Sequence, residues 1–332
     1  MKKPSNPFIT AGYQGARYFC DREIETKSLL QNMTNGLSTT LIAIRRIGKT
    51  GLIRHVLAKL PAGYTSVYID ILPTENMNEF LNVLASAVIN SIPQRTGPGK
   101  MIMDLIKSLR PVITYDPLTG IPQVTIDVRK GEAPKHIDSI FKYLEKFPKK
   151  IVIAIDEFQQ ILEYPEKNTD AWLRSSIQTL KNVTFIFSGS RQHLMDDLFS
   201  DPSRPFYRST SLLNIGKINP EKYSAFIIRH FKNNGIKIEK EIVAEMLEWT
   251  DIHTYYVQLL CNKVFAESGN QVTSRTWRME ANRLLEEQEL LFLKYRDLLT
   301  KQQWRLLKAI AREGQVYSPS SKDFVSKYSL GS

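Results

Sequence analysis

The feature that most constrains this chain is the segment LIAIRRIGKT at residues 41–50, an apolar run that leads into a loop ending in Gly-Lys-Thr. A phosphate-binding loop has the pattern G-x-x-x-x-G-K-[ST]. Gly48, Lys49 and Thr50 match its last three positions, and Ala43 stands where the first glycine is expected. Because so short a match also occurs by chance, it needs a strand before it, a helix after it and an acidic partner elsewhere in the chain.

The segments on both sides of the loop have the required patterns. Residues 38–44 are apolar and rich in β-branched side chains, which predicts a buried strand. Residues 51–60 have apolar side chains at helical spacing, and Pro61 follows them. Residues 66–71 and 77–92 predict a second strand and a second helix. Because strands alternate with helices, we expect an α/β fold with a parallel sheet covered on both faces.

The acidic partner follows an apolar strand predicted over residues 151–155. Asp156 and Glu157 stand at the carboxyl end of this strand, where ligands bind in open α/β sheets. The alternative interpretation is an ordinary strand followed by a solvated acidic turn. A Gly-Lys-Thr loop in the same chain favours the functional interpretation, because nucleotide sites combine the two features.

Each residue of this constellation has an expected role. Successive N–H groups of residues 45–50, at the start of a helix, form a concave donor site for phosphate oxygens. Lys49 adds a positive charge between the β- and γ-phosphates. Thr50 and Asp156 are the expected ligands of Mg²⁺. Glu157 is expected to polarise the attacking water.

A further strand is predicted over residues 183–187, and the polar run Ser188, Gly189, Ser190 and Arg191 follows it. In a parallel sheet these side chains lie beside the acidic pair, where a hydroxyl can contact the γ-phosphate or the attacking water. Both serines are candidates for this role. Ser-Gly-Ser is also an ordinary turn composition.

In this order, the motifs resemble the archaeal-type P-loop ATPase family, which is related to the STAND and AAA+ groups and similar in layout to origin-recognition ATPases. The motifs that carry the resemblance are FCDREIE (19–25), AIRRIGKT (43–50), IVIAIDE (151–157), GS (189–190), PFYR (205–208) and IHTYY (252–256). The loop and the Asp-Glu strand are fairly specific. The other motifs are weak singly and persuasive in order, and together they cover most of the chain.

The resemblance implies a cleft that binds ATP and Mg²⁺. The residues implied to contact the nucleotide are Phe19, Ala43, Arg45, Arg46, Ile47, Gly48, Lys49, Thr50, Gly51 and His253. The residues implied as catalytic are Lys49, Glu157, Ser190 and Arg208. An arginine that neutralises charge in the transition state acts from within the chain or from a neighbouring copy. Arg208 is the first candidate for this arginine, and Arg191 is the second; the alternative for either one is a surface arginine without this role.

Three positions depart from the family pattern. Ala43 replaces a glycine, and alanine fits any backbone with negative φ, so we expect a working loop. Arg208 follows Tyr207 without the usual glycine between them. Thr254 stands near the expected base, where the family often has proline.

We expect three units along the chain. Residues 1–217 form the P-loop core, with a β-hairpin insertion near residues 110–128 that is either a partner-binding or DNA-touching arm or an extension of the sheet. Residues 218–298 have helical patterns throughout and predict a lid. Residues 299–332 predict two helices and a helix cap at Ser332, which resembles a winged helix-turn-helix cut before its recognition helix.

Charge and cysteine content bear on the partners. The 332 residues include 45 Lys and Arg against 34 Asp and Glu, a net charge of +11 that favours a polyanionic partner or simply reflects a basic surface. Cys20 and Cys261 match no metal or redox spacing, so we expect reduced thiols in a cytoplasmic protein. The sequence has neither the apolar segment of a signal peptide nor a run long enough to span a membrane.

Two functions from different classes fit these observations. The first is a Mg²⁺-dependent ATPase whose nucleotide state moves the lid and so acts on DNA, through the C-terminal segment, or on a protein partner or a second copy. The second is a nucleotide-gated DNA-binding or scaffold protein that hydrolyses little or no ATP. A small-molecule kinase ranks third, because it needs neither the helical lid nor a tail of DNA-binding type.

Overall fold

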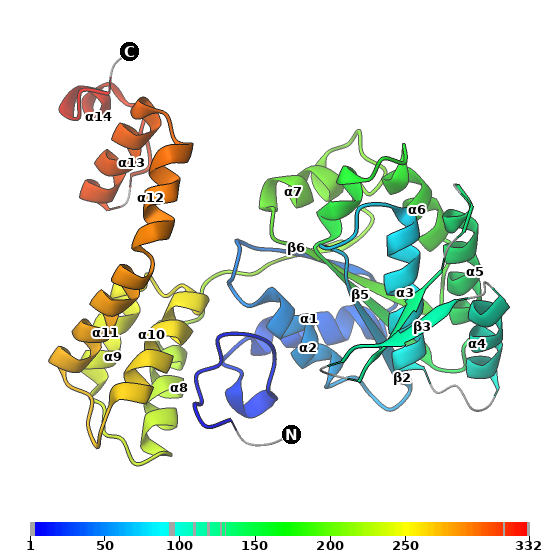
Figure 1. Cartoon of the computed structure of the whole chain (residues 1–332), viewed down its shortest axis with the longest axis horizontal. Coiled ribbons are helices and arrows are strands. Elements are labelled where there is room, and N and C mark those ends of the chain that lie inside the picture. The colour runs from blue at the N-terminus through cyan, green and yellow to red at the C-terminus, as the bar shows by residue number, and fades with distance from the viewer. Residues whose placement is uncertain are drawn as a thin grey trace.

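The computed structural model describes residues 4–92, 97–108, 111–117, 120–126, 128–129, 131–314 and 316–330. Its centre is a five-stranded parallel sheet in the order β2-β5-β6-β1-β7 (Figure 1). The strands are β1 (Thr39–Ile42), β2 (Tyr64–Asp70), β5 (Lys150–Asp156), β6 (Val183–Gly189) and β7 (Ser211–Asn214). The predicted α/β fold with a parallel sheet is confirmed.

Helices cover both faces of the sheet. Each strand packs against both helical layers, because its successive side chains point to opposite faces. In β5, Ile151, Ile153 and Ile155 pack against one helical layer, and Val152 and Ala154 pack against the other. The first layer holds α3 (Met77–Ser91), α5 (Ala133–Glu145), α6 (Thr169–Ile177) and α7 (Gln192–Ser200). The second layer holds α1 (Glu23–Thr34) and α2 (Lys49–Leu57). A strand buried on both faces needs a continuous apolar run, which is what IVIAI provides.

The insertion between α3 and α5 contains the predicted hairpin. Its elements are α4 (Pro98–Ser108), β3 (Val112–Tyr115) and β4 (Pro122–Thr125), and the two strands pair antiparallel. The hairpin forms its own two-stranded sheet, so the alternative in which it extends the main sheet is wrong. Side chains of α3 bind its edge instead: Ser86 Oγ accepts from Val124 N and Asn82 Oδ1 accepts from Ile126 N, both at 2.8 Å. Residues 110, 118–119 and 127, which belong to the predicted hairpin region, lie outside the described residues.

Four further helices pack together beside the sheet (Figure 1). They are α8 (Pro220–Lys232), α9 (Lys240–Trp249), α10 (Thr254–Glu267) and α11 (Ser274–Glu287). The first of them starts as its sequence predicts, with Pro220 in the first turn and Asn219 as the cap that accepts from the N–H groups of Glu221 and Lys222. We call this group of helices the lid.

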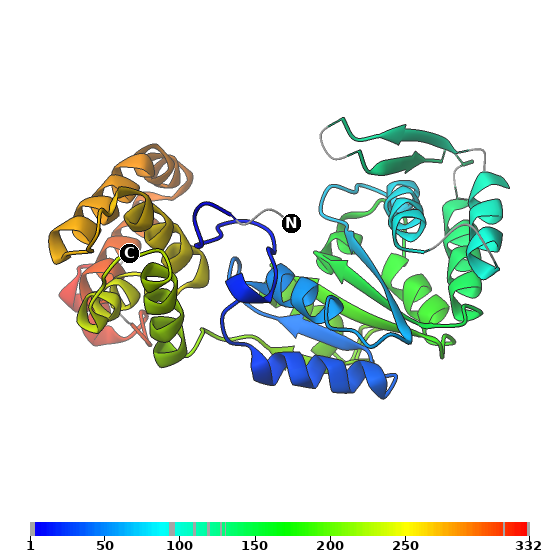
Figure 2. The ribbon, with the colours of Figure 1, turned by 90° about the horizontal axis from the view of Figure 1, so that it is seen from below.

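The N-terminal strap, residues 6–20, runs between the sheet and the lid (Figures 1 and 2). Phe8 is fully buried in the apolar core of the lid, and Cys20 also lies in that core. Asn262 of α10 donates to Phe8 O at 2.8 Å, and its own carbonyl accepts from Asn6 at 2.9 Å. The start of the chain is therefore packed as part of the lid.

The tail leads away from the lid on the side opposite the strap's N-terminus (Figure 1). The helix α12 (Glu289–Leu298) leads to it from α11, and the tail itself comprises α13 (Lys301–Glu313) and α14 (Lys322–Lys327), which confirm the two helices predicted there. Ser321 caps α14 by accepting from Phe324 N. The predicted cap at Ser332 lies outside the described residues. In the part of the chain that is described, no helix has the length and apolar character needed to cross a bilayer.

The packing of the strap predicts the cost of truncating Phe8. Phe8→Ala removes a fully buried ring from the lid core, which should lower the free energy of unfolding by about 3–5 kcal/mol. Urea unfolding followed by circular dichroism measures this loss. The control is Ile24→Ala on α1, whose side chain is 78% exposed and whose loss should be almost neutral. Equal unfolding midpoints for Phe8→Ala and wild type would contradict the packing of the strap.

Candidate functional site

The loop between β1 and α2 curves around the start of α2. Gly48 caps this helix with φ 104°, a backbone conformation that residues with a Cβ rarely adopt. Ala43 is not among the described residues with positive φ, so the alanine causes no backbone strain, as expected. Its methyl group is buried between the sheet, α1 and α2. The N–H groups at this helix start form a site suited to an anion.

Lys49 lies inside the loop. Only 6% of its surface is exposed, and its ammonium donates to the carbonyl oxygens of Ala43 at 3.3 Å and Ile44 at 3.2 Å. Burial lowers the pKa of Lys49, while the carboxylates of Glu157 and Asp156 oppose that shift. The lysine and the acidic pair thus occupy one electrostatic environment.

Asp156, at the end of β5, is almost completely buried and accepts hydrogen bonds from four donors. Thr50 Oγ1 donates to Oδ2 at 2.7 Å, and Tyr68 OH donates to the same oxygen at 2.9 Å. Ser188 Oγ and the N–H of Glu157 donate to Oδ1. Burial, followed by the charge of Asp156, raises the pKa of Tyr68, so this phenol remains a donor. The structure thus places Thr50 and Asp156, the two expected ligands of Mg²⁺, within hydrogen-bond distance of each other.

Glu157 follows in a left-handed conformation, with φ 57°, at the start of the 3-10 helix η2 (Phe158–Glu163). Ser190 binds one of its carboxylate oxygens, Oε2, through Oγ at 2.8 Å and through its N–H at 3.2 Å. The amide of Gln159 donates to the same oxygen at 2.6 Å. The two candidate serines therefore have separate partners, since Ser188 binds Asp156 and Ser190 binds Glu157.

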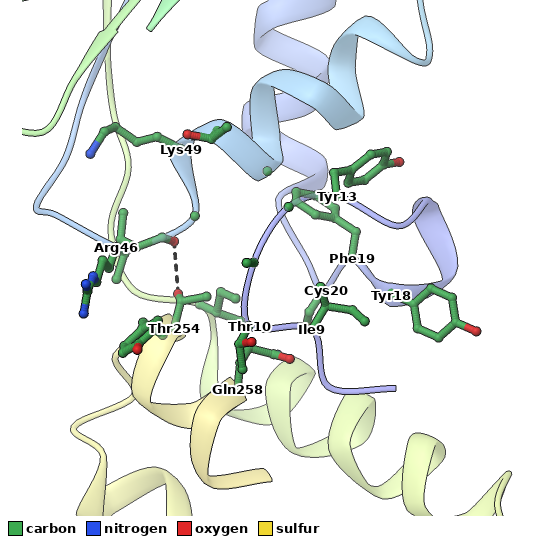
Figure 3. A pocket seen from close by; sticks show the side chains of 18 of the residues that line it. Ile9, Thr10, Tyr13, Tyr18, Phe19, Cys20, Arg46, Lys49, Thr254 and Gln258 are labelled. Carbon is green, nitrogen blue, oxygen red and sulfur yellow. Dashed lines mark hydrogen bonds between the residues drawn. The ribbon is translucent and has the colours of Figure 1, made fainter. Parts of the chain in front are cut away.

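The start of α10 contacts the loop directly. Thr254 Oγ1 donates to Ile47 O at 3.0 Å, which Figure 3 draws as a dashed line. His253 Nε2 lies 3.2 Å from Arg45 O. The guanidinium of Arg46 lies over the ring of Tyr255, 4.4 Å from its centre. These contacts join the lid to the loop through backbone oxygens and one cation–π pair.

A second group of contacts joins the P-loop core to the lid at the linker that precedes α8. Arg22 is buried, and its guanidinium donates to Gly216 O at 2.7 Å and lies 3.5 Å from Ile47 O. Lys222 of α8 pairs with Asp21 at 2.7 Å and with Glu23 at 2.8 Å. Burial favours a higher pKa for Asp21, but hydrogen bonds, including that from Lys222, lower it to about 2.

A cleft of about 670 Å³ opens between the loop, the strap and the lid. In Figure 3, Thr10 of the strap lies near Gln258 of the lid, whereas the ring of Tyr13 lies beside Phe19. Residues that line it are Ile9–Gln14 of the strap, Tyr18, Phe19, Cys20, Arg22, Arg45 to Gly51 of the loop, Glu157, Ser190, Ile218, Thr254, Tyr255, Gln258 and Leu259. Phe19 stacks on His55 at a ring distance of 4.1 Å. A Cβ at Gly51 would lie 3.7 Å from the Phe19 ring, an ordinary van der Waals distance, so this ring lies beside the first turn of α2.

Four of the predicted residues do not line the cleft. Asp156 and Ala43 lie behind the loop, and His253 contacts the loop from outside. Arg208 is exposed and precedes β7, which runs parallel to β1, so it lies near the amino end of the sheet, opposite the loop. The second arginine candidate, Arg191, pairs with Glu163 at 2.8 Å.

Sequence patterns do not single out Tyr68 and Gln159, which bind the two carboxylates of the acidic pair. Tyr68 lies near the end of β2, and only the pairing of β2 with β5 brings it to Asp156. Gln159 stands close after the Asp-Glu pair, and this short distance along the chain is the one signal in the sequence that points to it. Within the described residues, no cluster of three or more His, Cys, Asp or Glu is arranged to hold a metal ion.

Comparisons with known proteins agree with this arrangement. The sequence profile of a family described as "ATPase domain predominantly from Archaea" matches residues 19–260. A second profile, described as "Probable winged helix domain", matches residues 290–332. No curated protein sequence matches the chain.

Several solved structures share the fold. The Walker-type ATPase of Pyrococcus abyssi is 18% identical, with a TM-score of 0.62 over 92% of this chain and 83% of that one. The ORC2 protein of Aeropyrum pernix in its ADPNP–ADP complexes is 12% identical, with a TM-score of 0.60 over 92% and 78%. The ORC1 protein of Aeropyrum pernix, solved in complex with DNA, is 13% identical, with a TM-score of 0.55 over 94% and 77%. At these identities the similarity concerns the fold.

Proposed function

The chain belongs to the family of ATPase domains that occur predominantly in Archaea, and we propose that it binds ATP with Mg²⁺ in the cleft, hydrolyses it, and uses the nucleotide state to move the lid. The observation that carries this proposal is that Lys49, the Thr50–Asp156 pair and Glu157 lie at one end of one sheet, beside one cleft. Phosphoryl transfer requires a site that binds the phosphates, oxygen ligands that bind a divalent cation, and a carboxylate that orients the attacking water.

The donor set at Thr50 and Asp156 fits Mg²⁺. This ion prefers oxygen ligands and usually keeps several waters, so one hydroxyl and one carboxylate suffice on the protein side. Asp156 is held from both sides by Tyr68 and Ser188, which orients its carboxylate toward Thr50. When bound, Mg²⁺ would neutralise charge on the phosphates.

The strap and the lid form the proposed nucleoside part of the site. Phe19 offers an aromatic face near the loop, and Tyr255 and Gln258 face the same cleft from α10. His253, expected at the base, is proposed to act indirectly, because it contacts Arg45 O and does not line the cleft. The lid therefore contacts the residues that would bind the phosphates, so a movement of the loop would alter the contacts that hold the lid in place.

Arg208 is proposed to act on the site of a neighbouring copy. Its place near the amino end of the sheet, away from the loop of its own chain, supports that assignment over action within one chain.

The three units proposed are the core (1–217), the lid (218–298) and the tail (299–332).

DNA is the proposed partner of the tail. Residues 290–332 hold eight Lys and Arg against three Asp and Glu, a net charge of +5. Lys301, Arg305, Lys308 and Arg312 recur at helical spacing on α13, and all four are exposed. No ion pair engages them within the described residues. Such a stripe suits the phosphate backbone of DNA, which attracts positive charges that have no ion-pair partner.

The first test is ATP binding by Lys49→Ala. Losing the charged phosphate contact should cost about 1.5–3 kcal/mol and weaken ATP binding roughly tenfold or more. Titration calorimetry measures the affinity. The control is Lys59→Ala, an exposed lysine beyond the end of the same helix, which should bind ATP like wild type. Equal affinities for Lys49→Ala and wild type would refute the phosphate site.

Turnover by Glu157→Gln separates the enzyme from the gated binding module. The amide keeps the shape but loses the carboxylate, so turnover should fall on the order of 10²-fold or more while ATP affinity is kept. Phosphate release is measured with and without duplex DNA. Glu163→Gln, at an exposed carboxylate of η2, is the control and should keep its turnover. If Glu157→Gln equals wild type in every condition, the binding module is the better interpretation.

The DNA assignment is tested by replacing Lys301, Arg305 and Lys308 with glutamine. Fluorescence anisotropy with duplex DNA at several salt concentrations should give weaker binding and a salt slope smaller by up to about 0.9 per lost phosphate contact. The matched control replaces three exposed lid lysines, Lys232, Lys237 and Lys240. If both triple variants bind DNA like wild type, a protein partner replaces DNA in the proposal.

A further inference from the structure

Gln159 is a buried polar side chain at the edge of the site. Only 2% of its surface is exposed, and it belongs to the first turn of η2. Its Nε2 donates to Glu157 Oε2 at 2.6 Å. The assignment of nitrogen to this side of the amide is forced by chemistry, because a carboxylate oxygen accepts a hydrogen bond only from a donor.

The other end of the amide is confined by the neighbouring strand. Gln159 Oε1 is buried without a hydrogen-bond partner. It lies against Gly189, where an added Cβ would come within 2.1 Å of it and within 2.6 Å of Met195 Sδ. Glycine at position 189 therefore provides the space that lets this amide reach Glu157. Burying a carbonyl oxygen without a hydrogen-bond partner costs free energy. The hydrogen bond at the other end of the amide compensates for this cost.

Three donors converge on one oxygen of Glu157. They are Gln159 Nε2, Ser190 Oγ and Ser190 N, and all three bind Oε2. Among the described residues, the hydrogen bonds of this side chain involve Oε2 alone, which leaves Oε1 available as an acceptor. Because a free carboxylate rotates about its last bond, donors that hold one oxygen also fix the direction of the other.

We propose that Gln159 is a positioning residue for ATP hydrolysis, which holds the Glu157 carboxylate so that Oε1 accepts the hydrogen bond of the attacking water. This inference rests on the proposed function. In that step the water oxygen bonds to the γ-phosphorus, the bond to the bridging oxygen breaks, and the water proton moves toward Glu157. Gln159 acts only through Glu157 and touches neither the nucleotide nor the water.

The opposite role for the same contact is a brake, in which Gln159 keeps Glu157 away from the water until it is released. The geometry favours positioning, because Ser190 holds the same oxygen independently of Gln159 and leaves the other oxygen of the carboxylate without a donor. The two roles predict opposite changes in turnover when the amide is removed.

The experiment compares Gln159→Met with Gln160→Met in the full chain. Methionine keeps the length of the side chain and removes the donor. The side-chain amide of Gln160 donates to Thr74 O at 3.0 Å, and this residue bonds Glu157 through its backbone N–H, at 2.9 Å from Glu157 O. Replacing its side chain therefore controls for the loss of an amide in the same turn. Gln159→Met should lower kcat on the order of tenfold or more, with KM for ATP within about twofold. Gln160→Met should change neither parameter by more than about twofold.

Two further arms keep the inference falsifiable. In a Glu157→Gln background, Gln159→Met should cause no additional loss, because the residue acts through the carboxylate. Ser190→Ala removes a second donor to Oε2 and should lower kcat in the same direction. A rise in kcat for Gln159→Met, an unchanged kcat, or an equal loss in both backgrounds would overturn the inference.

A crystal structure of Gln159→Met separates this inference from the proposed function, since it does not depend on turnover. The carboxylate of Glu157, then held by Ser190 alone, should be rotated or occupy two orientations. A carboxylate that stays in one unchanged orientation would overturn the positioning role even in an active ATPase. A displaced carboxylate in a protein without turnover would support the positioning of Glu157 and refute the proposed hydrolysis.

Discussion

The hydrogen-bonded carboxylate of Asp156 is the contact on which the site depends. It receives donors from α2, through Thr50, from β2, through Tyr68, and from the end of β6, through Ser188. A buried carboxylate is stable only when such donors replace its lost hydration. These donors come from three different elements, so the strand order β2-β5-β6-β1 must form before they meet. The same contacts then fix α2, and with it Lys49 and the phosphate loop.

The carbonyl oxygen of Ile47 has a comparable role between loop and lid. It accepts from Thr254 of α10 and lies within reach of Arg22, which also binds Gly216 in the linker to the lid. A displacement of this single peptide group changes the contacts of the lid, the linker and the segment before α1 together. Coupling of this kind needs no long chain of intermediates, because all the parts share one backbone atom.

The sequence predicts the elements that local chemistry determines. Apolar runs predict β1, β2, β5 and β6, because strands buried on both faces need them. It does not predict β7, since Ser211–Asn214 is short, alternates between exposed and half-buried residues, and is defined by its pairing with β1. The loop and the Asp-Glu pair are visible as motifs. Tyr68 reaches Asp156 only through the pairing of β2 with β5, and Gln159 reaches Glu157 through the local turn at the start of η2, which the motif does not specify.

The strap has a consequence for the order in which the cleft is assembled. Its residues precede the sheet and the lid in the sequence, yet Phe8 and Asn6 find their partners on α10, more than 250 positions later. Contacts of such large sequence separation carry a high loop-closure cost and form late in folding. One wall of the cleft therefore closes only after the lid helices exist, although the phosphate loop opposite it is built from neighbouring residues. The complete cleft would therefore form as one of the last events of folding.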